Sequence, residues 1–87
     1  MENNILVFSI LKTLEEKYMC FNDICLKLNN NKVEFEQKML FMLLSKLQLN
    51  NILLPNCIPD QNGFLVKYYF LTRNGQKYIQ QNNYPII

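Results

Sequence analysis

The five residues 59–63, Pro-Asp-Gln-Asn-Gly, constrain the fold of this chain more than any other segment. Asn-Gly between two apolar runs is the strongest short-range signal for a β-hairpin, because both residues tolerate the positive φ of tight turns. The preceding run, residues 52–58, contains Pro55 and is expected at the edge of a sheet. The following run, residues 64–71, is rich in aromatic and branched residues and predicts the partner strand.

Helical periodicity surrounds this hairpin. Helices are expected from residue 3 or 4 to about 18, from 21 to 28, and from 33 or 34 to 49, where Asn51 suits the left-handed end. Thr72 is expected to cap a last helix over residues 73–81. The order is helix, helix, helix, hairpin, helix, in a single mainly α domain with a β-hairpin (α+β) over residues 1–87. The expected core face of the first helix consists of Leu6, Val7, Ile10, Leu11, Leu14 and Tyr18.

Composition argues against an enzyme. The 87 residues include no histidine, which removes the commonest general base and any Ser-His or Cys-His pair. Gly63 and Gly75 are too far apart to form a loop that binds phosphate. The three cysteines, Cys20, Cys25 and Cys57, form no C-x-x-C pair and are interpreted as small buried hydrophobic residues. No catalytic residue, cofactor or metal site is expected.

The longest apolar run, residues 39–44, is far too short to cross a membrane, and the N-terminus lacks a signal-peptide pattern, so a cytoplasmic protein is expected. The net charge of +2 is unevenly distributed. Residues 1–36 hold four lysines and six acids, whereas residues 37–87 hold five basic groups against Asp60 alone. A basic half suggests a polyanionic partner, and the alternative is an ordinary solvated basic surface.

Two stretches carry a resemblance to a known superfamily. Residues 44–53, Leu-Ser-Lys-Leu-Gln-Leu-Asn-Asn-Ile-Leu, resemble the exit of the recognition helix in winged-helix regulators. Residues 69–78, Tyr-Phe-Leu-Thr-Arg-Asn-Gly-Gln-Lys-Tyr, are similar to the Y-x-L-T-x-x-G-x-x-Y segment that follows the wing in MarR- and PadR-like proteins. The resemblance implies a winged helix-turn-helix whose third helix enters the DNA major groove and whose hairpin is the wing. Asn51 departs from the glycine that the family usually has at this position.

The third helix carries two apolar stripes. At 100° per residue, one stripe is expected to face the core and consists of Leu40, Leu43, Leu44 and Leu47. A helix lying along the major groove should not bury a second apolar stripe against polar base edges. We therefore expect a homodimer interface on that stripe, with only the N-terminal turn of the helix reaching DNA. The alternative is that residues 84–87 or the first helix cover the stripe. The second stripe consists of Phe35, Met39, Met42 and Leu49, and the expected interface adds Ile5 and Phe8 of the first helix.

Pairing through recognition helices is a feature of small centromere-binding proteins from tubulin-like plasmid and phage partition systems, which this chain resembles in size and composition. That resemblance implies an adaptor that coats centromere repeats, couples them to a tubulin-like GTPase filament and represses its own operon. A MarR- or PadR-like repressor is the alternative within DNA binding. A third hypothesis is a winged-helix module that binds another protein through the second stripe and binds no DNA.

The candidate DNA contacts surround the third helix and the wing. Gln37 is the expected base reader, because glutamine pairs well with adenine, and Lys38 is the better-placed phosphate contact of the two lysines on this helix. Glu34 is interpreted as a partner of the helix dipole that could also accept from cytosine. Any of these side chains can instead be an ordinary solvated residue. The expected DNA-binding residues are Asn30, Asn31, Lys32, Gln37, Lys38, Asn62, Gly63, Lys67 and Arg73.

Overall fold

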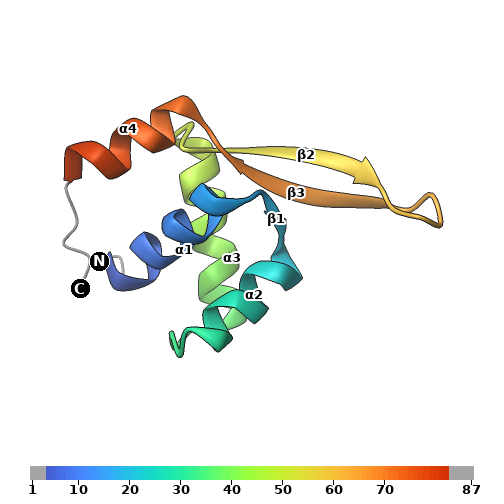
Figure 1. Cartoon of the computed structure of the whole chain (residues 1–87), viewed down its shortest axis with the longest axis horizontal. Helices are drawn as coiled ribbons and strands as arrows, with labels where there is room; N and C mark the ends of the chain where they lie inside the picture. The colour runs from blue at the N-terminus through green and yellow to red at the C-terminus, as the bar shows by residue number, and fades with distance from the viewer. Residues whose placement is uncertain (1–3, 83–87) are drawn as a thin grey trace.

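The computed structural model describes residues 4–82, and in this part of the chain four helices gather at the base of a three-stranded antiparallel sheet (Figure 1). The expected mainly α fold with a hairpin wing is confirmed. The elements are α1 (Asn4–Glu16), β1 (Met19–Cys20), α2 (Phe21–Asn30), α3 (Gln37–Leu49), β2 (Leu53–Pro59), β3 (Leu65–Leu71) and α4 (Arg73–Asn82).

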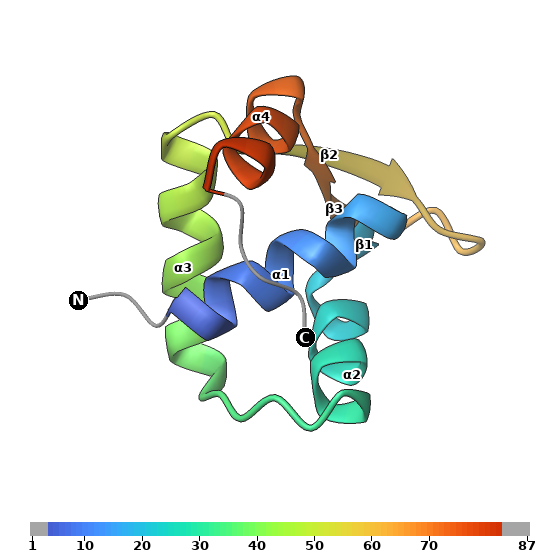
Figure 2. The ribbon, with the colours of Figure 1, turned by 60° about the vertical axis from the view of Figure 1, so that its left-hand side comes forward.

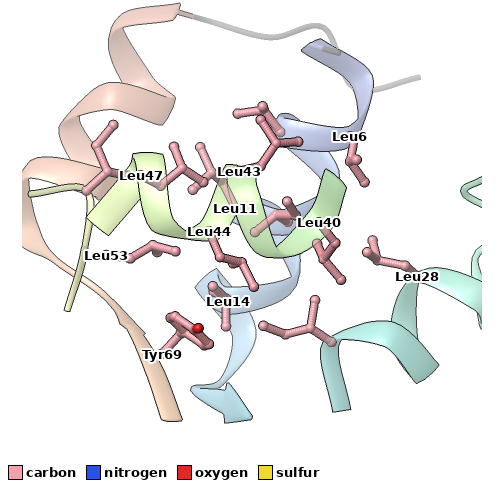
Figure 3. Close-up of a cluster of buried hydrophobic side chains, with 14 of the residues drawn as sticks. Leu6, Leu11, Leu14, Leu28, Leu40, Leu43, Leu44, Leu47, Leu53 and Tyr69 are labelled. Atoms are coloured by element: carbon pink, nitrogen blue, oxygen red, sulfur yellow. The ribbon is translucent and has the colours of Figure 1, made fainter. Parts of the chain in front are cut away.

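The core lies where α1 crosses α3, closed by α2 on one side and by the base of the sheet on the other (Figures 2 and 3). All four leucines of the expected core stripe of α3 are buried, as are Leu53 and Tyr69 from the sheet. The expected core face of α1 is confirmed except for Tyr18. Because α1 ends at Glu16, Tyr18 leaves the helix and is 43% exposed. The buried residues of the α3 stripe are Leu40, Leu43, Leu44 and Leu47.

Both helices of the helix-turn-helix end in the same hydrogen-bonded motif. After α3, Asn51 adopts φ 62°, its N–H donates to Gln48 O at 3.0 Å, and Ile52 N–H donates to Leu47 O at 2.9 Å. These two bonds define a Schellman C-cap, in which the left-handed residue allows the chain to leave the helix axis. The prediction that asparagine replaces glycine in this conformation is confirmed at Asn51.

The equivalent cap after α2 shortens the third helix relative to the prediction. Lys32 adopts φ 61°, and Val33 N–H donates to Leu28 O at 2.9 Å, so Val33 belongs to the end of α2. Residues 33–36 then run as an extended segment in which Val33 and Phe35 are half-buried against the core and the two glutamates between and after them are exposed. The expectation of a helix from residue 33 or 34 is therefore wrong, and Phe35 lies outside α3.

The sheet has strand order β1-β3-β2, so β2 is an edge strand, as its proline predicted. The two-residue strand β1, in which Met19 pairs with Tyr69, was not predicted. In the hairpin, all seven residues of β2 pair with β3, from Leu53 opposite Leu71 to Pro59 opposite Leu65. The hairpin therefore stays regular along its whole length and projects as a wing beyond the helices (Figure 1).

The chain reverses direction at residues 60–64, and Asp60 makes the hydrogen bonds that hold this loop. Gly63 N–H donates to Asp60 O at 3.0 Å, and Asp60 N–H donates to Phe64 O at 2.8 Å. Asp60 Oδ1 also accepts from the backbone N–H groups of Asn62 and Phe64, at 2.8 and 2.9 Å. Gly63 has φ 84°, the left-handed conformation that completes this type of three-residue hairpin loop. The predicted hairpin turn is confirmed.

The start of α4 is tied to the end of α3. Thr72 Oγ1 accepts from Gly75 N–H at 2.9 Å, which confirms Thr72 as the N-cap of α4. Thr72 N–H donates to Ile52 O at 3.1 Å, and its hydroxyl lies 2.7 Å from Asn51 O. A Cβ on Gly75 would lie 2.5 Å from both Ile52 O and Leu71 Cδ1. The threonine and glycine of the 69–78 stretch thus hold two segments in close contact.

Candidate nucleic-acid interface

Five of the predicted DNA-binding residues lie around the connection between α2 and α3, which we call the α2–α3 edge. Asn30 is the last residue of α2 and Asn31 is its C-cap. Gln37 and Lys38 are the first two residues of α3. All five side chains, including Lys32 in the connecting turn, are exposed. These residues are therefore exposed along the α2–α3 connection, in the lower part of Figure 1.

The N-terminus of α3 offers backbone donors to an anion but lies among mixed charges. Its N-cap, Glu36, makes no side-chain capping bond, and the first turn contains no acid. Uncapped N–H groups and the positive end of the helix dipole favour a phosphate at this position. The exposed carboxylates of Glu34 and Glu36, however, balance the charges of Lys32 and Lys38. This edge is therefore polar and close to neutral.

The side of α3 that faces away from the core carries four exposed apolar residues beside Lys38. Met39, Phe41, Met42 and Leu49, which we call the outer face of α3, are 43%, 54%, 55% and 82% exposed. Phe41 contacts the ring of Phe21 from α2, with centroids 6.4 Å apart. The predicted second stripe is therefore present on the helix surface, although it lacks Phe35.

The other two predicted interface residues lie on α1. Ile5 is 75% exposed, whereas Phe8 is half-buried. Phe8 and Phe35 are thus already partly covered by the chain itself, while Ile5 and the outer face of α3 remain open to solvent. A second copy of the chain is not needed to complete the core. The predicted dimer interface therefore depends on the exposed residues Ile5, Met39, Met42 and Leu49.

The wing places its candidate residues far from the α2–α3 edge (Figure 1). Asn62 and Gly63 are exposed at the tip, and the ammonium of Lys67 lies 5.1 Å from the ring centroid of Tyr69, back toward the helices. Sequence reasoning missed the apolar character of the tip, where Phe64 and Leu65 are each 70% exposed. The run of uncharged residues that follows the turn is the sequence feature that could have predicted this apolar tip.

Arg73 occupies a third location. It is the first residue of α4 and is exposed, next to the C-terminal end of α3. Because α3 is 13 residues long, this end lies about 18 Å along the helix from Gln37. The predicted DNA contacts therefore fall into three groups, at the α2–α3 edge, on the wing and at the start of α4.

The three cysteines differ in exposure: Cys20 is half-buried, Cys25 is buried and Cys57 is exposed. Burial, with a smaller contribution from the nearby Cys20 thiol, raises the pKa of the Cys25 thiol and makes it a poor nucleophile. Cys57 is exposed on the wing, so the prediction of a buried cysteine is wrong there, because the outer wing has no layer covering it. Across residues 4–82, no three His, Cys, Asp or Glu side chains gather as metal ligands would. None of the helices described is long and apolar enough to span a bilayer.

No protein-family model matches the sequence, and no curated protein shows significant similarity to it. Solved structures do match. A PadR-like transcription factor from Bacteroides fragilis superimposes with a TM-score of 0.81 at 24% identity, covering 92% of this chain and 78% of its own. A PadR family transcription regulator from Clostridium difficile gives a TM-score of 0.81 at 18% identity, over 90% and 82% of the two chains. The fold is a winged helix-turn-helix.

A third neighbour was solved with its ligand. Bacillus subtilis PadR in complex with operator DNA superimposes with a TM-score of 0.79 at 18% identity. The match covers 95% of this chain but only 50% of the PadR chain. At these identities the comparisons establish the winged-helix fold that the sequence predicted, and they associate it with transcription regulators.

Proposed function

We propose that this chain is a dimeric double-stranded DNA-binding protein that acts as a transcriptional repressor. The observation that carries the proposal is the exposed polar edge at the start of α3, in a fold shared with a regulator solved on its operator. In this arrangement the first turn of α3 enters the major groove. Gln37 reads a base edge there, and Lys32 and Lys38 contact phosphates.

The other two groups of residues give secondary contacts. The exposed backbone and amide at Asn62 and Gly63 reach the sugar-phosphate backbone from the wing, with Lys67 behind them. Arg73 meets a phosphate beside the far end of α3. Because few cations are involved, a single site is expected to bind weakly and to depend on salt concentration.

The outer face of α3 supports the dimer. Apolar side chains that are about half-exposed or more gain from burial against a copy of themselves, and they gain little from polar base edges. Pairing at Met39, Met42 and Leu49, with Ile5 alongside, places the two N-terminal turns of α3 at the two sides of the interface. Each turn then remains available to its own half of a DNA site.

DNA binding is tested by fluorescence anisotropy with a labelled fragment carrying the promoter of the chain's own gene. We expect binding at low salt that weakens as salt rises. Lys38→Ala should reduce the affinity and the salt slope, whereas Gln37→Ala should reduce discrimination against an unrelated duplex. Lys17→Ala is the matched control, since it removes an exposed lysine outside all three groups. Absence of binding at low salt would favour the protein-interaction module.

The dimer is tested separately by sedimentation. Met42→Lys places a charge in the proposed interface and is expected to give monomers. Leu26→Lys introduces the same charge at a residue of α2 that is similarly exposed, 61% against 55%, and should leave the dimer intact. A Met42→Lys protein that still sediments as the parent dimer would refute this interface.

The same outer face favours a second candidate function, the centromere-binding partition adaptor. That role uses the same DNA contacts and adds a tubulin-like GTPase filament as a partner. A reporter fused to the chain's own promoter and a plasmid-retention assay separate the two roles. Loss of repression without loss of plasmid retention in Lys38→Ala would favour the repressor alone.

A further inference from the structure

Phe41 is an exposed aromatic residue of α3 that the proposed dimer does not use. It is 54% exposed, although burial of a phenyl ring is favourable. At about 100° per residue, Phe41 is turned by about 100° from Met42 and about 160° from Met39 around the helix axis. A partner copy packed on the two methionines therefore leaves Phe41 at the margin of the interface.

The same residue lies on the side of α3 that carries Gln37. The two residues are four apart in the sequence, so their side chains are separated by about 40° around the axis and about 6 Å along it. Long side chains in helices lean toward the N-terminus, so the Phe41 ring extends toward the first turn of α3. This geometry places a phenyl ring next to the side chain that is proposed to read a base edge.

A contact with α2 restricts the position of this ring. The ring centroids of Phe41 and Phe21 are 6.4 Å apart, with an interplanar angle of 64°. Phe21 is the first residue of α2 and is half-buried against the core. An edge-to-face aromatic pair of this kind stabilises the packing beyond the area that it buries. The protein thus supports one side of the Phe41 ring and leaves the rest open to solvent.

The base edges of the major groove offer an apolar group to such a ring only at thymine. They otherwise present hydrogen-bond donors and acceptors, whereas thymine adds its 5-methyl group. We propose that Phe41 contacts a thymine methyl next to the base read by Gln37, so that the protein selects thymine at that position. This inference rests on the proposed DNA binding, and it names a specificity contact that requires no cation.

The size and the position of this effect follow from the geometry. Transfer of one methyl group from water into an apolar contact changes an affinity about three- to fivefold. The separation of about 6 Å between Gln37 and Phe41 along α3 corresponds to at most about two base pairs, at about 3.4 Å per pair. The selected thymine should therefore lie within about two base pairs of the base that Gln37 reads.

The experiment is fluorescence anisotropy on the promoter fragment of the chain's own gene, with each thymine in turn replaced by deoxyuridine, which lacks only the 5-methyl group. We expect one thymine in each half-site whose replacement weakens binding about three- to fivefold. Phe41→Ala should bind the thymine and deoxyuridine duplexes with equal affinity. Leu26→Ala is the matched control, since it also removes an exposed apolar side chain, 61% against 54%, and it should discriminate like the parent.

The outcomes separate a failure of the thymine contact from a failure of DNA binding. Equal affinity of the parent protein for all the duplexes would overturn the contact and leave the proposed DNA binding intact. Discrimination that persists in Phe41→Ala would assign the effect to the shape of the DNA and would also overturn the contact. Absence of binding to every duplex at low salt would refute the proposed function together with this inference.

The methyl group can be moved to another base as a second test. With cytosine at the selected position, 5-methylcytosine should raise the affinity of the parent about three- to fivefold and that of Phe41→Ala not at all. An unchanged affinity of the parent would contradict the methyl contact. Phe41→Ala should sediment as the parent dimer, and a monomeric Phe41→Ala protein would place the ring in the dimer interface and overturn its assignment to the groove.

Discussion

The two ends of α3 are built in opposite ways. At the C-terminal end, a Schellman cap, the backbone bond from Thr72 to Ile52 and the close approach of Gly75 fix the helix to the sheet and to α4. At the N-terminal end, Glu36 provides no side-chain cap, and the preceding segment is extended with both of its acids exposed. One end is defined by backbone contacts inside the protein, and the other presents its backbone donors to solvent.

This difference indicates a division of labour along one helix. The fixed end sets the orientation of α3 relative to the wing. When α3 binds a ligand, the position of the wing on that ligand is therefore restricted. The open end has backbone groups whose best partners are water or a ligand. Substitutions at the two ends should therefore affect different properties, with stability dominant at the fixed end and binding more sensitive at the open end.

The largest effect is expected from Gly75→Ala. Alanine would normally stabilise a helical position by about 1 kcal/mol relative to glycine. Here its Cβ would lie 2.5 Å from a backbone carbonyl, and we expect the free energy of unfolding to fall by about 2–3 kcal/mol. Urea unfolding at a fixed protein concentration measures it. Gly63→Ala, whose Cβ would meet nothing within 4 Å, should lose only about 1 kcal/mol from its positive φ.

The next effect is expected from Thr72→Ala. Removing the hydroxyl deletes the N-cap of α4 and the contact with Asn51 O, which should lower the free energy of unfolding by about 1–2 kcal/mol. Thr72→Ser retains the oxygen and should stay close to the parent protein. Equal losses in the two variants would show that the methyl group, and not the capping bond, secures this end of α3.

A stabilising change is expected at the open end from Glu36→Ser. Serine suits the extended backbone of this residue (φ −96°, ψ 142°) and should cap α3, adding about 0.5–1 kcal/mol to the free energy of unfolding. Loss of the carboxylate should also tighten DNA binding about 2- to 5-fold. Glu34→Ser separates the two effects, since it removes the same charge without capping. A Glu36→Ser protein with weaker DNA binding would contradict the placement of phosphate at this helix end.

The smallest effect is expected from relaxing the left-handed residue after α3. Asn51→Gly should add only a few tenths of a kcal/mol, because asparagine already tolerates φ 62°. Lys32→Gly, at the equivalent position after α2, should add about 0.5 kcal/mol, because lysine tolerates this conformation less well. Thermal unfolding of both variants beside the parent gives the comparison, and a loss at either position would contradict it.

The sequence predicted the parts of the fold that repeat a pattern. The leucines of α3 recur at helical spacing, and the hairpin follows from its turn residues and flanking apolar runs. The start of α3 could not be predicted, because Val33 and Phe35 also fit a helical period. What ends the pattern is a left-handed lysine at residue 32, a conformation that lysine does not favour. The strand β1 is too short to leave any periodicity.

The candidate site was predictable in part. The exposed cluster at the α2–α3 edge and the apolar outer face of α3 both follow from helical geometry. The position of Lys67 over Tyr69 follows from strand geometry, because residues two apart share a face. The contact of Phe41 with Phe21, in contrast, depends on how separate segments pack, which spacing along the chain does not encode. For the same reason, the net positive charge of residues 37–87 did not indicate that its basic side chains lie in separate parts of the structure.

The two prolines of β2 determine how other molecules can approach the wing. Asp60, which directly follows β2, donates its N–H toward β3. By the alternation of an antiparallel pair, the N–H groups of even-numbered residues of β2 point to β3, and those of odd-numbered residues point to solvent. Pro55 and Pro59 therefore remove two of the outward donors from the exposed edge. An incoming strand therefore finds too few partners along β2 to extend the sheet at that edge. Recognition along this edge of β2 is left to its side chains.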